Sequence, residues 1–339
     1  MQRIRGPMAV FFVLTMAFGA AHAQPKCEVD RPVVFAGLDY DSAAFHNAVA
    51  QRIVRDGYGC KVDAIPGSVI PLINGMLRGD VQVNMEIWKS NQPASWTEGV
   101  AAGTLVEVGV NFPDATQGWY VPRYLVEGAK PPALGLQSVS DLPKYKALFA
   151  DPEEPGKGRF YNCPAGWQCE FFNTKKLHAY GLDASYTNFR PGTGAALDAA
   201  ITSALKRKKP VLFYYWNPTW LMGQLGKQLV QLQEPPYDEA VWDALKAAKD
   251  PKDVKAATAY PVVSVVIGAR KDFLDAAPRL HEFLAHYRTS AALVSEALAY
   301  MQQHKASADD AARHFLQTRE AVWKDWVPAD VAARVKAGL

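Results

Sequence analysis

Three of the nine tryptophans share a context that suits ligand binding. Trp88 and Trp216 directly follow apolar, strand-like runs, and Trp167 lies between Cys163 and Cys169. Several indole faces around a methylated ammonium group attract it by cation–π interaction, and no hydrogen-bond donor is required. At about 2 kcal/mol per desolvated face, three faces supply ~6 kcal/mol, which corresponds to a dissociation constant of roughly tens of micromolar. The sequence therefore indicates a tryptophan-walled pocket for an organic cation; the alternative is that each tryptophan is an ordinary core residue.

The four cysteines are an even number, which is typical of a protein that folds in an oxidising compartment. Cys163 and Cys169 are six positions apart, around a proline and a glycine, which fits a small closed loop. Cys27 lies just before one strand-like run and Cys60 at the start of another. We therefore predict the disulfides Cys163–Cys169 and Cys27–Cys60. A metal site is the competing interpretation, but the spacing is not C-x2-C and no histidine neighbours either pair, so we predict none.

The N-terminal sequence predicts export. Arg3 and Arg5 give a positive start, residues 8–20 are apolar, and residues 21–23 form a small-x-small cleavage site. The apolar stretch is shorter than the ~20 residues of a permanent membrane helix, so we expect a signal peptide over residues 1–23 rather than an anchor. A cysteine does not directly follow the cleavage site, which favours a free periplasmic protein over a lipid-anchored one.

The mature chain alternates strands and helices. Strand-like runs at 32–37, 61–65 and 81–87 are separated by helices that begin at Asp41 and Val69. This order predicts a parallel sheet with right-handed crossovers, in which ligands bind outside the carboxyl ends of the strands. Further on, the sequence predicts connections over 131–158, helices over 193–208 and from 272 onward, and strands at 118–122, 211–215 and 261–269.

Composition limits the function further. The chain has 37 lysines and arginines against 34 aspartates and glutamates, a formal net charge of +3, so we do not expect a nucleic-acid partner. The sequence does not contain the zinc-protease motif, because His281 and His286 are five positions apart and do not share a helix face. No glycine-rich phosphate loop with its lysine is present. A glycan-active enzyme with Glu86 and Glu170 as acid and base is an alternative, but we predict no catalytic residues and no cofactor.

Several segments resemble one protein family. Residues 162–170, Asn-Cys-Pro-Ala-Gly-Trp-Gln-Cys-Glu, resemble the Cys-Asn-Pro-Gly-Trp-Gly-Cys-Glu loop of periplasmic glycine-betaine-binding proteins. Residues 213–220, Phe-Tyr-Tyr-Trp-Asn-Pro-Thr-Trp, resemble their Phe-Tyr-Tyr-Thr-Trp-Thr-Pro-Tyr-Trp segment, and 261–264 and 323–327 are similar too. These proteins are the substrate-binding components of ABC importers for glycine betaine and related osmolytes. The resemblance spans nearly the whole mature chain and implies two α/β lobes that close on the ligand like jaws.

The resemblance also implies roles for individual residues. Trp88, Trp167 and Trp216 would form the ammonium cage. Family relatives that bind choline add a tyrosine near the first crossover strand, for which Tyr120 or its neighbour Trp119 is the candidate.

The carboxylate end of the ligand would meet a different set of residues. Some family members hold it with a histidine four residues after the first cage tryptophan; here that position is Gln92, which donates a hydrogen bond but offers no charge. They also have glycine after the loop tryptophan, where this chain has Gln168; the backbone N–H groups of Gln168 and Cys169 could still face a carboxylate.

Acidic residues favour a different ligand. Glu86 shares a strand face with Trp88, and Asp39 and Asp41 lie at a neighbouring strand end. A carboxylate beside the cage would favour a purely cationic ligand such as choline, because a buried charge needs a partner. The alternatives are that Asp41 caps a helix and that Glu86 pairs with a lysine.

Together these observations predict a bilobal α/β protein with parallel-type sheets. Lobe 1 would hold residues 24–120 and 262–339 and lobe 2 residues 121–261, with hinges near Tyr120 and Tyr260. The expected partners are a small quaternary-ammonium ligand and the membrane permease of an ABC importer, and we expect a monomer. Glycine betaine is the first ligand candidate, choline or carnitine the second, and a ligand-binding sensory module is a third class of function.

Overall fold

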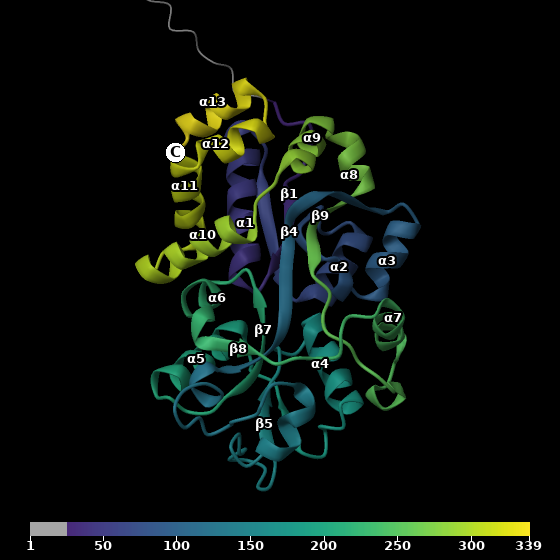
Figure 1. Ribbon diagram of the computed structural model, residues 1–339. Helices are drawn as coiled ribbons and strands as arrows, with labels where there is room; N and C mark the ends of the chain where they lie inside the picture. The colour runs from purple at the N-terminus through teal and green to yellow at the C-terminus, as the bar shows by residue number, and fades with distance from the viewer. Residues whose placement is uncertain (1–25) are drawn as a thin grey trace, which may run out of the picture.

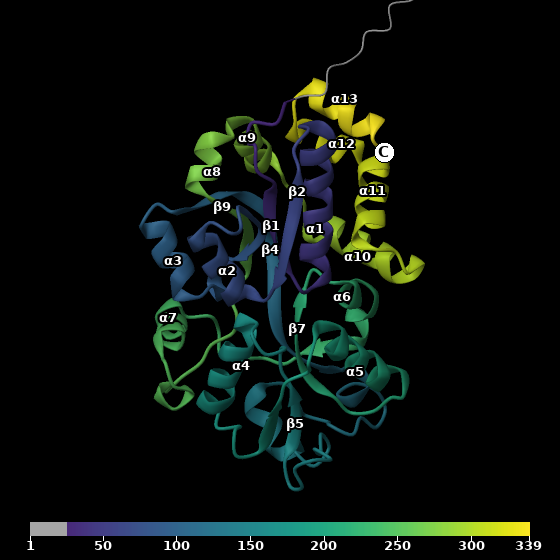
Figure 2. The same ribbon diagram turned by 180° about the vertical axis from the view of Figure 1, so that it is seen from behind.

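The computed structural model describes residues 26–339 and has two lobes, as predicted. Figures 1 and 2 show the lobes one above the other, with strand β4 (Leu105–Pro122) running from the upper into the lower lobe. The predicted signal peptide lies outside the described residues. Within residues 26–339, no helix combines the length and the apolar character needed to cross a membrane.

The sheet of the upper lobe, lobe 1, begins with the predicted βαβαβ unit. Strand β1 pairs in parallel with β2 and with β3, and helices α1 and α2 form the two crossovers. Their bounds are β1 (Val33–Leu38), α1 (Asp41–Arg52), β2 (Val62–Gly67), α2 (Val69–Arg78) and β3 (Val83–Trp88). Strand β9 (Val263–Arg270) then pairs antiparallel with β3 and with the first part of β4, so the sheet is mixed.

Strand β4 links the two sheets. It pairs with β9 from Leu105 to Ala115 and with β7 from Thr116 to Tyr120, so its partner changes between Ala115 and Thr116. The sequence pattern indicated only the end of this strand, at 118–122. The first part of the strand was not predicted, because three register shifts interrupt its pairing with β9. Bulges of this kind break the alternation of apolar and polar residues.

The sheet of lobe 2 continues from β4 in the order β4-β7-β5-β6, with β8 on β4. Strand β5 pairs in parallel with β6 and β7, and β7 pairs antiparallel with β4. The bounds are β5 (Gly158–Tyr161), β6 (Tyr186–Phe189), β7 (Leu212–Asn217) and β8 (Leu229–Gln231). Helices α4 (Gln168–Ala179), α5 (Gly194–Lys206), α6 (Trp220–Leu225) and α7 (Glu239–Ala247) belong to this half of the chain.

Helices cover both faces of the lobe 1 sheet. Helices α2 and α3 lie on one side, and α1 lies on the other with the C-terminal helices (Figures 1 and 2). The remaining bounds are α3 (Ala94–Ala101), α8 (Lys271–Ala276), α9 (Pro278–His286), α10 (Ala291–His304), α11 (Ala308–Thr318), α12 (Glu320–Trp323) and α13 (Ala329–Ala337). The expected helix from 272 is thus interrupted at Ala277, because Pro278 cannot continue the hydrogen-bond ladder.

Two large apolar cores correspond to the two lobes. Trp242 lies in the core of lobe 2, and Trp323 and Trp326 lie in that of lobe 1. Trp88 and Trp220 are only partly buried and pack against both cores, so they stand where the lobes meet. The predicted disulfide Cys27–Cys60 is present and fastens the start of the described chain to the segment before β2.

Candidate functional site

A cavity lies between the lobes, at the carboxyl ends of strands, where the parallel-sheet rule expects a ligand. Lobe 1 contributes Trp88, the last residue of β3, and Tyr40, two residues after β1 ends. Lobe 2 contributes Trp216 near the end of β7 and Trp167 just before α4. The full lining is Tyr40, Val69, Trp88, Asn91, Gln92, Gln117, Trp167, Gln168, Cys169, Tyr214 and Trp216.

The aromatic rings of the cavity meet at steep angles and form a corner. The rings of Trp167 and Trp216 are 5.3 Å apart at 78°, and those of Tyr40 and Trp167 are 5.3 Å apart at 68°. The Tyr214 ring stacks on Trp216 at 6.2 Å. Faces set at right angles can surround a compact tetrahedral group, which a single flat wall cannot do. The three tryptophans singled out by sequence are therefore brought together at one cavity.

Two hydrogen bonds and a disulfide hold Trp167 in place. Its indole Nε1 donates a hydrogen bond to Oδ1 of Asp39 in lobe 1, at 2.8 Å. Its backbone N–H donates to the carbonyl of Pro164 at 3.3 Å, inside the loop that the predicted Cys163–Cys169 disulfide closes. The disulfide thus fixes the loop, and the Asp39 hydrogen bond ties the ring to the opposite lobe.

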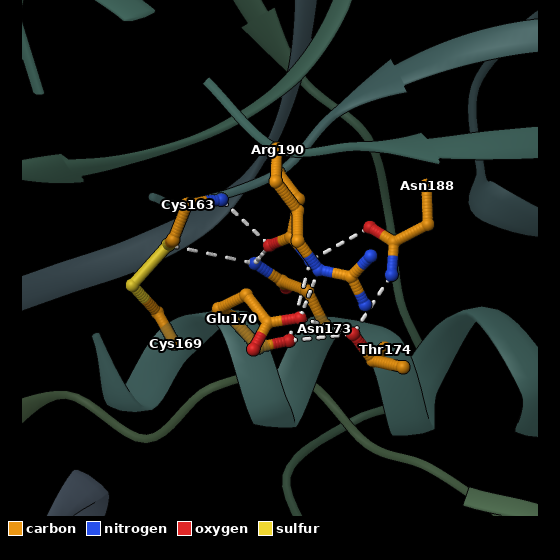
Figure 3. Close-up of polar contacts among 8 residues, drawn as sticks. Cys163, Cys169, Glu170, Asn173, Thr174, Asn188 and Arg190 are labelled. Atoms are coloured by element: carbon orange, nitrogen blue, oxygen red, sulfur yellow. Dashed lines mark hydrogen bonds and ion pairs between the residues drawn. A yellow bond between two sulfur atoms is a disulfide. The ribbon is translucent and has the colours of Figure 1, made fainter. Parts of the chain in front are cut away.

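A polar network supports this loop from the side of α4 (Figure 3). Glu170 accepts a hydrogen bond from Nε of Arg190 at 2.5 Å and one from the hydroxyl of Thr174 at 3.0 Å. Thr174 in turn accepts one from Nδ2 of Asn188 at 2.8 Å. Glu170 therefore forms an ion pair outside the cavity. Neither Glu170 nor Glu86 lines the cavity, although the glycan-enzyme alternative requires both carboxylates there.

The amino terminus of α4 supplies the polar end of the cavity. The helix begins at Gln168, directly after Trp167, and no side chain caps it. The first N–H groups of a helix have no partner within the helix, so those of Gln168 and Cys169 remain for a ligand. The helix dipole makes such an end favourable for a negatively charged group. Both residues line the cavity.

Three amide side chains complete the lining. Oε1 of Gln117 accepts hydrogen bonds from Nδ2 of Asn91 and from the Tyr214 hydroxyl, both at 2.6 Å. Nε2 of Gln92 donates to the carbonyl of Trp88 at 3.3 Å, while its buried Oε1 has no partner among the described residues. Gln92 is therefore a lining residue whose buried amide oxygen is unsatisfied. The hydrogen bond to Trp88 tells the two amide atoms apart, because only the nitrogen can donate to a carbonyl group.

Glu86 lies behind Trp88 rather than in the cavity. Its side chain is 1% exposed, and its Oε2 accepts a hydrogen bond from Nε1 of Trp88 at 3.1 Å. Burial raises the pKa of Glu86 to about 7, against which the hydrogen bonds from Trp88 and Ser42 act. Burial also lowers the pKa of the neighbouring His46 to about 3, so this imidazole is neutral at physiological pH. The alternative that Glu86 pairs with a lysine is not supported, because no lysine pairs with it among the ion pairs of residues 26–339.

Tyr120 does not line the cavity. In β4 it lies opposite Phe213, while Gln117 lies opposite Trp216. Side chains alternate between the two faces of a sheet, so Gln117 and Trp216 share one face and Tyr120 points to the other. There its hydroxyl donates to Gln231 at 3.2 Å. Trp119, the neighbour considered with it, is fully buried and donates to Asn173 instead.

Asp41 lies in a second cavity next to the first. It is the first residue of α1, whose N-cap is Tyr40, so the expected capping side chain is not used. This neighbouring cavity also contains Asp39 and Asp198, and it shares Tyr40, Trp167 and Trp216 with the first. Burial raises the pKa of Asp198 to about 6; its carboxylate accepts hydrogen bonds from Tyr215 at 2.6 Å and Trp220 at 2.9 Å.

The structure adds site residues that the sequence analysis missed: Tyr40, Val69, Asn91, Gln117 and Tyr214. Tyr40 had a signal, because it lies in the turn after the first strand, at a carboxyl end. Tyr214 also had a signal, because it is two residues before Trp216 and shares its face of the strand. Gln117 had none, since it reaches the site through the pairing of strands almost a hundred residues apart. Within residues 26–339, no group of three or more His, Cys, Asp or Glu side chains is arranged to hold a metal ion.

Comparison with known proteins agrees with this fold. Residues 31–318 match the family described as the substrate binding domain of ABC-type glycine betaine transport systems. A glycine betaine-binding periplasmic protein of Dickeya dadantii is 29% identical over 234 residues, which are 66% of this chain and 67% of that protein.

Solved structures share the fold. A glycine betaine and L-proline transporter binding protein of Borrelia burgdorferi superposes with a TM-score of 0.71 at 16% identity, covering 90% of this chain and all of the other. An ABC-transporter choline-binding protein in complex with choline gives 0.70 at 16% identity, covering 91% and 97%. The match over most of the chain, on a two-lobed fold with an aromatic cavity between the lobes, places this protein in the family of substrate-binding domains of ABC-type glycine betaine transport systems.

Proposed function

We propose that this protein binds a trimethylammonium compound in the cavity between its lobes, and that glycine betaine is the ligand the geometry supports best. The observation that carries the proposal is the lining of the cavity by Trp88, Trp167 and Trp216 beside the uncapped start of α4. The indole faces suit the ammonium group, which offers no hydrogen-bond donor. The N–H groups of Gln168 and Cys169 suit a carboxylate.

The charges around the cavity support a zwitterion. None of its lining residues is an aspartate or glutamate, so a ligand carboxylate meets no like charge there. The lining also includes no lysine or arginine, so the carboxylate would rest on backbone N–H groups and on the amides of Asn91 and Gln92. A ligand whose two ends are both charged can thus have each end stabilised by a different part of the wall.

Choline is the second candidate, and Gln92 favours it. The buried Oε1 of Gln92 lacks a hydrogen-bond donor, and a hydroxyl group in the cavity would supply one. An unsatisfied buried acceptor costs about 1–3 kcal/mol, so a ligand that satisfies it gains correspondingly. Glycine betaine has no donor to offer at this position.

Transport would follow from closure of the lobes. We infer that residues 24–120 with 262–339 move against 121–261, and that the closed, loaded protein docks on a membrane permease in the periplasm and releases its ligand unchanged. The change of partner along β4, between Ala115 and Thr116, supports a bend in this stretch. The hydrogen bond from Trp167 to Asp39 joins one lobe to the other. It supports the idea that site residues themselves stabilise the closed form.

Calorimetric titration of the purified protein with glycine betaine, choline, carnitine and trimethylamine N-oxide tests the proposal. We expect binding at micromolar concentrations, recovery of the ligand unchanged after long incubation, and weaker binding in Trp167→Ala and Trp216→Ala. Tyr120→Phe, on the opposite face of the same sheet, serves as the matched control. If none of the four ligands binds below about a millimolar, the proposal is wrong.

A further inference from the structure

Glu86 is a buried carboxylate without a cation. Its side chain is 1% exposed, and in the described chain no lysine or arginine forms an ion pair with it. Buried charges in proteins are normally paired, because an isolated ion in the interior is costly. In such a place the carboxyl group either takes up a proton or, when ionised, needs a positive group from elsewhere.

His46 does not fill that role. Its Nε2 is 3.8 Å from Oε1 of Glu86, which is too long for a hydrogen bond, and both atoms lack a hydrogen-bond partner among the described residues. Its Nδ1 is paired with the hydroxyl of Tyr287 at 2.8 Å, and its ring stacks on Phe112. The imidazole is thus held in place by other contacts and is not drawn onto the carboxylate.

The other oxygen of Glu86 faces the candidate site through one side chain. Oε2 accepts the indole N–H of Trp88, and Trp88 is a wall of the cavity. A hydrogen bond to a carboxylate makes an indole ring richer in electrons. A cation on the ring therefore gains both the stronger cation–π contact and the direct attraction of the charge behind it, which water screens little because Glu86 is buried.

We propose that the ammonium group of the ligand is the missing counter-ion of Glu86 and acts across the indole ring of Trp88. The inference rests on the proposed function, and it makes Glu86 a positioning residue that reaches the ligand only through Trp88. It follows that the ligand stabilises the ionised form of Glu86, and that binding and proton release are linked.

The direction of the linkage is set by the charges around Glu86. The titratable groups that face it are Tyr40 after β1, His46 on α1 and Tyr287 after α9. Burial keeps both tyrosines protonated and His46 neutral near pH 7, so Glu86 is the group that changes. A cation favours the carboxylate, so affinity is expected to rise with pH and a proton to leave on binding.

Calorimetry in two buffers of different ionisation enthalpy measures the protons released. At pH 7 we expect roughly half a proton to leave per choline bound, since the carboxyl is then about half ionised, and almost none at pH 8.5. Choline affinity is expected to be about tenfold higher at pH 8 than at pH 5.5. The rise for glycine betaine should be smaller, because its own carboxylate is repelled by Glu86.

Glu86→Gln separates this role from a merely structural one, because the amide oxygen still accepts the Trp88 hydrogen bond. We expect the variant to lose proton release and pH dependence, and to bind choline about tenfold more weakly at pH 8 but nearly as well as the native protein at pH 5.5. Asp198→Asn removes the buried carboxylate that accepts the Trp220 indole, and it should keep proton release.

The outcomes separate the two proposals. If the native protein binds neither choline nor glycine betaine, the proposed function and this inference both fail. If it binds them without releasing a proton and with equal affinity at pH 5.5 and 8, only the counter-ion role of Glu86 is wrong, and this result does not require the Glu86→Gln variant to fold. Proton release that survives in Glu86→Gln and vanishes in Asp198→Asn also overturns it.

Discussion

The hydrogen bond between Trp167 and Asp39 joins the two lobes across the candidate site, so its loss is expected to weaken ligand binding. Nε1 of the indole is 2.8 Å from Oδ1 of the carboxylate. Hydrogen bonds to a charged group contribute about 1.5–3 kcal/mol. Because Asp39 is exposed to solvent, the lower end applies, which corresponds to a roughly tenfold change in affinity. The bond exists only when the lobes are together, so this energy favours the closed, ligand-bound form.

Calorimetric titration of a double-mutant cycle tests this value. Asp39→Ala and Trp167→Phe should each raise the dissociation constant, the first about tenfold. Trp167→Phe keeps an aromatic face but has no N–H, so adding Asp39→Ala to it should cost nothing more. Asp41→Ala is the matched control, because Asp41 is on the same rim and makes no hydrogen bond to lobe 2 among the described residues.

Two results would refute this reasoning. An affinity of Asp39→Ala within twofold of the native value means that the lobe-to-lobe hydrogen bond does not stabilise the bound form. A loss that persists undiminished in the Trp167→Phe background means that Asp39 acts through its charge on the ligand and not through the indole.

Three further predictions follow from the same geometry. Trp216→Ala should weaken ligand binding by about 2 kcal/mol, the value of one desolvated indole face, while Tyr120→Phe should leave the calorimetric affinity unchanged; equal losses would contradict the assignment of the sheet faces. Glu86→Gln should raise the free energy of unfolding of the ligand-free protein by up to about 3 kcal/mol at pH 8, because the folded-state pKa of about 7 exceeds the unfolded one and ionisation in the core destabilises the fold. In urea unfolding the gain should shrink below about 1 kcal/mol at pH 5, and a gain independent of pH would rule out ionisation as its cause. Replacing Cys163 and Cys169 with serine should lower the free energy of unfolding by about 2 kcal/mol, as expected for so short a loop, and unchanged stability would show that the loop is ordered without its disulfide.

Local patterns predicted the parts of the fold that local physics decides. The βαβαβ unit and both disulfides were predicted correctly from the residues, whereas the two-lobed architecture was predicted correctly from the family resemblance. Trp88 and Trp216 end their strands and therefore reach the sheet edge, which is why their contexts were informative. Whether these residues bind the ligand stays a prediction that the titrations address.

The positions of some side chains relative to the site could not be predicted, because they depend on the pairing and packing of elements that are distant in the sequence. Tyr120 was predicted at the site by resemblance to relatives that bind choline, yet the register of β4 on β7 turns it to the other face. Glu86 shares a face with Trp88 as expected, but helix α1 and Tyr287 cover it, so it lies behind the wall. How deeply a side chain such as Glu86 is buried depends on elements from distant parts of the chain that pack over it. No local sequence pattern predicts this burial.

The place of β9 in the sheet has a consequence for the order in which the chain can fold during synthesis. Strand β9 lies between β3 and β4, although residues 263–270 follow both by well over a hundred positions. The strands of lobe 2 are contiguous in sequence and can pair as soon as β8 has emerged, while β3 and β4 must wait for a partner still being made. Until then their facing edges are open to wrong pairings. The unfinished upper lobe is thus the part of a nascent chain most in need of a chaperone, and the lower lobe is the part expected to resist proteases first.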